Sequence, residues 1–182
     1  MEFARTRLAD ARVIDLQRHE DSRGFFARTF CAQEFAEAGL ATGFVQHSQS
    51  YNRARGTLRG MHFQLAPHRE VKLVRCIAGA IFDVIIDLRP DSPSYLQWEG
   101  FELSAGNGRT LYVPEGFAHG FQTLADDTHV LYAISRPYAP EAAAGVRHDD
   151  PAFGIAWPLP VAAISEKDAA WPLVDPGRGV RI

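Results

Sequence analysis

The sequence predicts an all-β protein, and three observations support this. Between residues 44 and 135, short apolar or alternating runs recur, separated by turn-forming Gly, Pro, Asn and Asp. Such a rhythm is typical of β-sandwiches and β-barrels. Beyond residue 136 prolines become frequent, which discourages central strands because proline has no backbone donor. Helical periodicity is confined to short segments, so we expect only a few short peripheral helices.

The helical segments lie at the two ends of the chain. Residues 32–40 predict a short amphipathic helix that turns Phe35 and Leu40 toward a core. Ser165 fits the N-cap of a single helical turn over residues 165–170. Between these helices, alternation of apolar and polar residues predicts strands at 58–64, 71–77 and 130–135.

We expect one domain over residues 1–182. Its barrel should span about residues 44–136, with an N-terminal segment before it and a Pro-rich C-terminal arm wrapped on it afterwards. A chain of 182 residues is large enough to bury a sizeable core.

Composition excludes several classes of function. The formal net charge is −3, so the chain as a whole does not attract nucleic acid or anionic membranes. The longest apolar run, residues 80–86, contains Asp83 and is too short to cross a bilayer. Cys31 and Cys76 form no CxxC motif, and the N-terminus lacks the apolar stretch of a signal peptide. We therefore expect a cytoplasmic protein without nucleic-acid or membrane partners.

Several polar residues share strand faces with apolar ones. His62 and Gln64 point to one side of their strand, and Lys72 and Tyr132 stand among apolar neighbours on theirs. Any one of them alone is ordinarily structural or solvent-facing. Together they predict a ligand pocket, because buried polar groups are costly unless a partner satisfies them.

Residues 108–119, GRTLYVPEGFAH, resemble the second cupin motif, G-x5-P-x-G-x2-H. The resemblance implies a cupin-type jelly roll, a double-stranded β-helix, with His119 at the barrel mouth. Many cupins bind a metal through a His-x-His pair, but here Gln64 follows His62 in place of the second histidine, and Lys72 adds a nearby cation. We therefore expect no metal.

Seven sequence blocks, in order, closely resemble the dTDP-4-dehydrorhamnose 3,5-epimerase family over about residues 21–173. They are DSRGFFARTF, TLRGMHFQ, VKLVRC, FDVIIDLR, PEGFAHGF, VLY and SEKDAA. The resemblance implies a homodimeric jelly roll that needs no metal or cofactor. The resemblance also implies that the substrate is a nucleotide-linked 4-keto-6-deoxyhexose, epimerised at C3, C5 or both.

The resemblance also implies roles for individual residues. By position, His62 is the general base, Asp168 its carboxylate partner, Lys72 the enolate stabiliser and Tyr132 the proton donor. The residues implied in substrate binding are Arg23 and Arg59 at the diphosphate, with Gln46, Ser48, His119 and Lys167 as further contacts.

These residue types suit proton abstraction beside a ketone. The carbon acid is weak unless a cation stabilises the enolate oxygen, and Lys72 supplies that charge. A histidine with a reference pKa of about 6.5 is a suitable base, and a carboxylate at its second nitrogen orients the ring. Inversion requires an acid across the sugar ring, the role expected of Tyr132.

The chain departs from the family pattern on the nucleotide side. Arg28 and Ala143 stand where glutamates are common, Ser48 lies in a region that usually reads Asp-Asn, and His148 replaces a tryptophan. A different nucleotide sugar or a monofunctional 3- or 5-epimerase therefore stays open. The alternatives from other classes are a metal-dependent cupin and a non-catalytic sugar-nucleotide binding protein.

Overall fold

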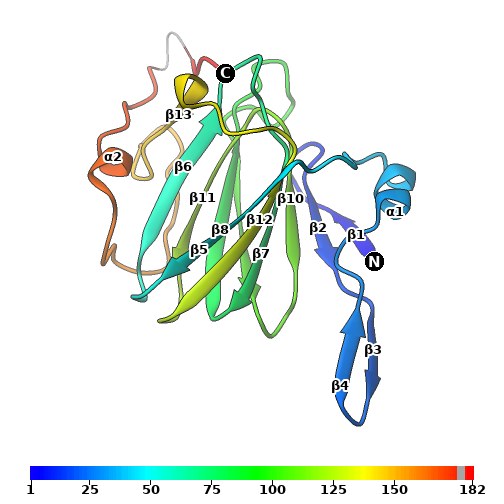
Figure 1. Ribbon diagram of the computed structural model, residues 1–182. Helices are drawn as coiled ribbons and strands as arrows, with labels where there is room; N and C mark the ends of the chain where they lie inside the picture. Colours follow the sequence, from blue (N-terminus) through cyan, green and yellow to red (C-terminus); the bar gives the residue numbers. More distant parts are fainter. Residues whose placement is uncertain (176–178) are drawn as a thin grey trace.

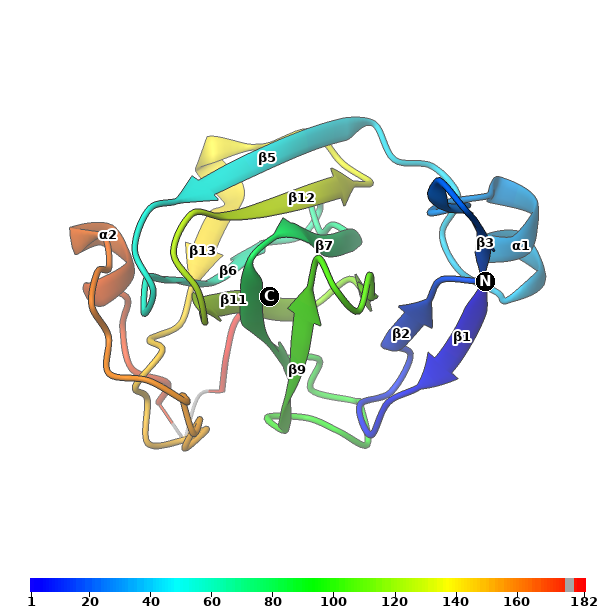
Figure 2. The ribbon, with the colours of Figure 1, turned by 90° about the horizontal axis from the view of Figure 1, so that it is seen from below.

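The computed structural model describes residues 1–175 and 179–182, which form two antiparallel sheets facing each other (Figures 1 and 2). The first sheet has the order β1-β2-β10-β7-β12-β5 and the second the order β13-β6-β11-β8-β9. The strands of the first sheet are β1 (Glu2–Arg5), β2 (Arg12–Asp15), β5 (Gln46–Asn52), β7 (Lys72–Ala78), β10 (Thr110–Val113) and β12 (Thr128–Ile134). Those of the second are β6 (Leu58–Gln64), β8 (Ala80–Asp87), β9 (Trp98–Ser104), β11 (Phe117–Thr123) and β13 (Ala143–Gly145). The all-β prediction is confirmed.

The main core fills the space between the sheets. Strand alternation turns one row of side chains from each sheet inward, so that Val74 and Cys76 of β7 meet Ile81 and Ile85 of β8. Burial raises the pKa of the Cys76 thiol to about 11, so this cysteine behaves as an apolar core residue. The core occupies most of the interior and leaves one end of the sandwich for polar side chains.

The C-terminal arm covers the outer face of the second sheet. Met61 and Phe63 of β6 point outward and pack in one cluster with Val146 and Phe153 of the arm. The arm also contributes the three-residue strand β13, which pairs with the edge of β6. The arm thus lies on the second sheet, and its prolines do not interrupt a central strand.

The N-terminal segment adds strands that the sequence rhythm did not indicate. β1 and β2 extend the first sheet through the pairing of β2 with β10. The hairpin of β3 (Arg18–Asp21) and β4 (Gly24–Ala27) projects away from both sheets (Figure 1). Among the described residues β3 and β4 pair with each other and with no strand of either large sheet, so the hairpin stands outside the core.

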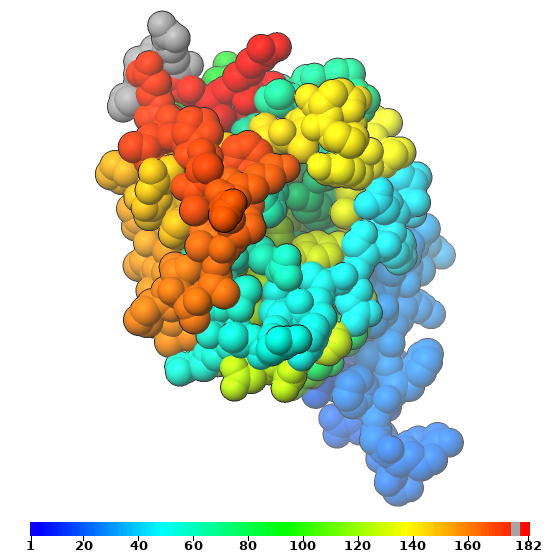
Figure 3. Space-filling model, turned by 60° about the vertical axis from the view of Figure 1, so that its left-hand side comes forward, coloured from blue at the N-terminus to red at the C-terminus, as the bar shows by residue number. Residues whose placement is uncertain are grey.

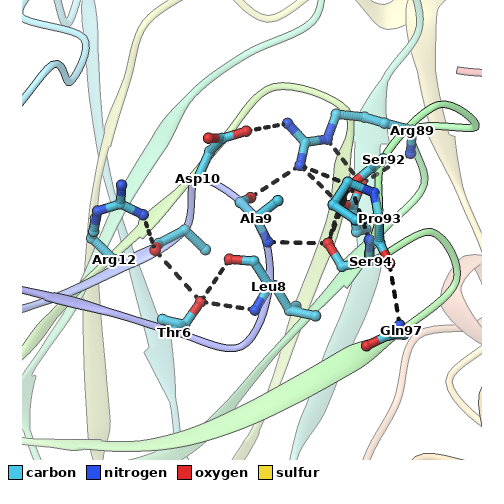
Figure 4. A network of polar contacts seen from close by, with 12 residues as sticks. Thr6, Leu8, Ala9, Asp10, Arg12, Arg89, Ser92, Pro93, Ser94 and Gln97 are labelled. Carbon is cyan, nitrogen blue, oxygen red and sulfur yellow. Dashed lines mark hydrogen bonds and ion pairs between the residues drawn. The ribbon is translucent and has the colours of Figure 1, made fainter.

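A polar network fastens the N-terminal turn to the loop after β8 (Figure 4). The Arg89 guanidinium donates to the Asp10 carboxylate and to the carbonyl of Ala9, at 2.8 and 3.0 Å. Ser94 Oγ accepts from the N–H of Ala9. Asp87 accepts hydrogen bonds from Arg89. Burial raises the pKa of Asp87, but the hydrogen bonds from Arg89, Ser92 and Ser94 together outweigh it and hold the pKa below its usual value. The network fixes one end of the first sheet.

The helices are short, as predicted. The helix α1 (Ala32–Glu37) buries Phe35, and α2 (Glu166–Ala169) begins at Ser165, whose Oγ accepts from the N–H of Asp168. The predicted N-cap is therefore confirmed. A single 3₁₀ turn, η1, covers Pro140–Ala142. Among the described residues, none of the helices has the length and apolar character needed to cross a membrane.

Candidate active site

A cavity of about 370 Å³ opens at the end of the sandwich where β5 and β6 diverge. One wall comes from β5, β7 and β12, the opposite wall from β6, β11 and β13, and α2 lies at the rim. Figure 3 shows the hollow between the segments coloured cyan, yellow and orange. The predicted residues that line it are Gln46, Ser48, Arg59, His62, Lys72, His119, Tyr132 and Lys167. Residues more than 100 positions apart in the sequence thus line the same cavity.

His62 and Asp168 form a hydrogen-bonded pair at the cavity wall. His62 Nε2 lies 2.6 Å from Asp168 Oδ1, and the other carboxylate oxygen accepts from the N–H of Gly60 at 3.3 Å. Burial raises the pKa of Asp168, but the neighbouring His62 and the hydrogen bonds from Gly60 and Ser165 together outweigh it, so the pKa lies below its ordinary value. The carboxylate is therefore ionised at neutral pH and orients the imidazole. The imidazole lines the cavity and is 43% exposed.

A close approach of two glycines places His62 opposite His119. Gly60 has φ +143°, and a Cβ there would lie 2.6 Å from the Cα of Gly120. The absence of side chains lets β6 and β11 pass closely, with a register shift just after His119. The two histidines pair across the strands and both line the cavity.

His119 rests on a fully buried carboxylate. Its Nε2 lies 2.8 Å from Asp83 Oδ1, while Asp83 Oδ2 has no hydrogen-bond partner among the described residues. Burial raises the pKa of Asp83, and the neighbouring His119 and Lys72 only partly oppose this. The site thus contains a second His–Asp pair, in which the buried carboxylate holds the His119 ring in place.

Lys72 enters the cavity from the opposite sheet. Its Nζ lies 3.0 Å from Glu70 Oε1 and 3.4 Å from the carbonyl oxygen of His62. The side chains of Lys72 and Glu70 are both only 10% exposed. An ammonium therefore stands close to the backbone of His62, where it can face a ligand oxygen.

Tyr132 lies on the same sheet as Lys72 and faces His119, with ring centroids 6.1 Å apart. Burial raises the pKa of Tyr132 well above its usual value, and a hydrogen bond with Ser50 only partly opposes this. The phenol therefore carries its proton at neutral pH. Since β12 and β6 belong to facing sheets, Tyr132 and His62 approach the cavity from opposite walls.

Gln64 occupies the position of the second metal-binding histidine of other cupins, and here it holds the neighbouring loops. Its Oε1 accepts from the N–H of Ala139 at 2.7 Å, and its Nε2 donates to Glu70 at 2.8 Å and to the carbonyl of His68 at 3.0 Å. Within the described ranges no three His, Cys, Asp or Glu side chains gather as metal ligands do. The side-chain arrangement gives no support to the metal-dependent alternative.

Cations and amides line the remaining rim. Arg59 Nε donates to the side-chain oxygen of Asn52 at 2.6 Å, which fixes the guanidinium beside the cavity. Lys167 Nζ lies 5.4 Å from the ring centre of Trp171. Gln46 Oε1 accepts from the N–H of Tyr138, so the amide supports the segment that covers the rim. This end offers positive charge and an aromatic surface.

Arg23 is not part of this cavity. It lies in the projecting hairpin with an 87% exposed side chain and pairs with Asp21 at 2.6 Å. Within one chain the expected pair of Arg23 and Arg59 does not form. Arg28 also lies outside and pairs with Glu34 at 2.7 Å, whereas Ala143 lines the cavity.

Sequence reasoning assigned no catalytic or binding role to Glu70, Asp83 or Trp171. Asp83 carries a usable signal, because a charged residue in the middle of an apolar strand requires a buried partner. Trp171 and Glu70 carry no such sequence signal, because their positions in the site depend on how their loops fold.

The cavity at the end of this jelly roll holds two His–Asp pairs, a lysine and a protonated tyrosine. This combination defines a cupin-type enzyme that uses acid–base catalysis. A model of the family described as dTDP-4-dehydrorhamnose 3,5-epimerase matches residues 5–175. The chain belongs to this family of isomerases.

Individual relatives agree. A dTDP-4-dehydrorhamnose 3,5-epimerase from Sinorhizobium fredii is 43% identical over 173 residues, covering 94% of this chain and 89% of the relative. The crystal structure of the Bacillus anthracis enzyme with TDP and PPi bound has a TM-score of 0.92 and 40% identity, covering 95% of this chain and 99% of the other. The Legionella pneumophila epimerase in complex with dTDP-4-keto-L-rhamnose has a TM-score of 0.89 and 37% identity, covering 94% and 92%.

Proposed function

We propose that the chain epimerises a dTDP-linked 4-keto-6-deoxyhexose at C3 and C5, converting dTDP-4-dehydro-6-deoxyglucose to dTDP-4-dehydrorhamnose. The observation that carries the proposal is the His62–Asp168 pair at 2.6 Å, facing Lys72 and Tyr132 across one cavity. The family relationship supplies the substrate class. The non-catalytic alternative leaves this arrangement of charged groups without a use.

In the proposed mechanism His62 removes the proton from the carbon beside the C4 ketone. The electron pair of the C–H bond moves into an enolate whose oxygen faces the Lys72 ammonium. Asp168 stabilises the imidazolium that forms, because an ionised acceptor strengthens the hydrogen bond. Enolate stabilisation is the largest contribution expected, since the cation acts where charge develops.

The return of the proton determines the stereochemical outcome. Tyr132 donates its phenolic proton to the carbon from the wall opposite His62, so the carbon is inverted. The phenol holds a proton to donate at neutral pH, because burial raises its pKa. After the first inversion the His62 imidazolium releases its proton to solvent and the Tyr132 phenolate takes one up from solvent. The same pair of groups then serves the second carbon, since C3 and C5 both flank the one ketone.

Solvent deuterium exchange tests this function. In D₂O the wild-type protein should place deuterium at C3 and C5 of dTDP-4-dehydro-6-deoxyglucose and yield the epimerised sugar, as followed by NMR and mass spectrometry. Exchange and inversion at one carbon would establish a monofunctional enzyme. No exchange at either carbon would refute the epimerase proposal.

A thermal-shift comparison addresses the nucleotide. Arg59 and Lys167 at the rim, and Gln46 and Ser48 on β5, are proposed to hold the diphosphate and nucleoside. CDP- and GDP-linked 4-keto sugars should bind less tightly than the dTDP-linked sugar, as measured by thermal shift. A stronger shift with another nucleotide would overturn the dTDP assignment and draw attention to Ser48 and Ala143.

We propose further that the chain forms a homodimer. The β3–β4 hairpin leaves Phe26 74% exposed and Phe25 51% exposed, and an isolated two-stranded hairpin is marginally stable in water. Ile77 and Leu131 are also exposed large apolar side chains, on the first sheet. A second copy covering these side chains would bring the hairpin's Arg23 toward a cavity that a single chain leaves without it.

Sedimentation equilibrium tests the dimer. The wild type should sediment as a dimer at micromolar concentration, and Phe26→Ser should shift it toward monomer while the matched variant Tyr138→Ser should not. A monomeric wild type would refute the proposal.

A cytoplasmic location is proposed as well, supported by the two free cysteines, and cell fractionation tests it.

A further inference from the structure

A carboxylate inside the cavity has no part in the mechanism above. Glu70 lines the cavity with a side chain that is 10% exposed, and its Oε1 lies 3.0 Å from Lys72 Nζ. A negative charge this close to a developing enolate opposes the reaction by simple electrostatics. Its presence in the site therefore requires a compensating effect.

The carboxylate is itself fixed in place. Gln64 Nε2 donates to Glu70 Oε2 at 2.8 Å and also donates to the carbonyl of His68 at 3.0 Å. Gln64 in turn is held by the N–H of Ala139, which donates to its Oε1 at 2.7 Å. Gln64 and Ala139 are both buried. A chain of hydrogen bonds therefore runs from the loop around residue 139 to the Lys72 ammonium.

This chain determines where the lysine points. An ammonium has three hydrogens on a flexible four-carbon stem. Glu70 accepts one of them, and the carbonyl oxygen of His62, 3.4 Å from Nζ, accepts a second. With two hydrogens directed to fixed acceptors, the third is directed into the cavity that Lys72 lines.

We propose that Glu70 is a positioning residue. It orients the Lys72 ammonium toward the ketone oxygen of the substrate, and Gln64 in turn holds the Glu70 carboxylate in place. The inference rests on the proposed epimerase function. Misplacement of a reacting or stabilising group by about 1 Å reduces rates by about 100-fold. We expect this positional effect to exceed the electrostatic opposition of Glu70 to the enolate, so that loss of the carboxylate lowers the rate.

The two carbons of the sugar supply a specific readout. C3 and C5 both flank the C4 ketone, so a residue that acts through the enolate oxygen changes deuterium exchange at both carbons by the same factor. A residue that orients the sugar ring instead changes the ratio of the two exchange rates. Glu70→Gln removes the charge at nearly constant shape, and Glu70→Asp keeps the charge but withdraws the carboxylate by one methylene.

The experiment measures exchange at C3 and C5, dTDP affinity and thermal midpoint for the wild type and both variants. Glu141→Gln, which removes an exposed carboxylate outside the cavity, is the matched control. Both Glu70 variants should lower kcat and both exchange rates by about 10- to 100-fold, with an unchanged C3/C5 ratio and dTDP affinity within about two-fold. The control should match the wild type. If Glu70→Gln unfolds at the assay temperature, Glu70→Asp provides the comparison.

Three results would overturn the proposal: unchanged or faster exchange in the Glu70 variants, Glu70→Asp equal to wild type, or a shifted C3/C5 ratio. A double-mutant cycle adds a test that a structural role does not satisfy. In a Lys72→Met background Glu70→Gln should cause no further loss, whereas an equal loss in both backgrounds would contradict action through Lys72. Absence of exchange in the wild type itself would instead refute the epimerase function.

Discussion

Substitution of Asp168 by asparagine isolates the contribution of the His62–Asp168 pair. The variant retains a side-chain oxygen for His62 Nε2, 2.6 Å away in the wild type, but removes the negative charge that stabilises the imidazolium. The helix cap is unaffected, because Ser165 Oγ accepts from the backbone N–H of residue 168 and this bond does not involve the side chain of that residue. We therefore expect a loss of rate with the fold preserved.

The magnitude follows from the geometry. Hydrogen bonds to charged groups contribute about 1.5–3 kcal/mol. His62 is 43% exposed, so solvent screening reduces this to the lower part of the range, about 1.5–2 kcal/mol. At about 1.4 kcal/mol per tenfold, kcat should fall by about 10- to 30-fold.

The assay is the rate of deuterium exchange at C3 and C5 under saturating substrate, with thermal midpoint and dTDP affinity as controls. Asp149→Asn is the matched surface variant, because Asp149 pairs with Arg147 outside the cavity. Wild-type exchange in Asp168→Asn, with the fold intact, would refute the role given to the pair. A loss that appears only as weaker dTDP binding would refute it too.

Three other changes test separate parts of the structure. Tyr132→Phe should retain deuterium exchange from the His62 wall but lose net inversion by about 100-fold or more, since general acids contribute at least that factor; undiminished inversion would exclude Tyr132 as the donor. Asp83→Asn should stabilise the protein more at pH 7 than at pH 3. The pKa of Asp83 is raised in the folded state, so the wild type loses stability as the pH rises above about 4, and an asparagine does not. A difference in thermal midpoint that does not change with pH would contradict this. Gly145→Ala should lower the free energy of unfolding by about 1–3 kcal/mol, because the new Cβ would lie 2.4 Å from Trp171. Gly43→Ala is the control, since a Cβ there meets nothing within 4 Å and should leave stability unchanged. Equal effects of the two substitutions would refute the packing argument.

Local sequence patterns could predict the faces of the central strands. The alternation in residues 58–64 placed His62 and Gln64 on one side, and β6 has those same bounds. Lys72 is buried in β7 beside Val74 and Cys76, as its alternation indicated. These predictions succeed because a strand's side-chain period is fixed at two residues wherever the strand lies.

The partners of these residues could not be predicted from local patterns. Asp168 reaches His62 across 106 residues, and that meeting depends on how the C-terminal arm covers the second sheet. The family resemblance named Asp168 where periodicity could not. The position of Arg23 outside the cavity follows from a hairpin that packs on neither sheet, and short strands of this kind leave a weak signal in composition.

The central claim is that His62 removes a proton from the carbon beside the ketone, and deuterium exchange with His62→Asn tests it most directly. With dTDP-4-dehydro-6-deoxyglucose in D₂O, we expect exchange at C3 and C5 to fall by at least about 100-fold, the lower range for general-base catalysis, while dTDP affinity is retained. Exchange at the wild-type rate in a folded, dTDP-binding His62→Asn protein would contradict the claim.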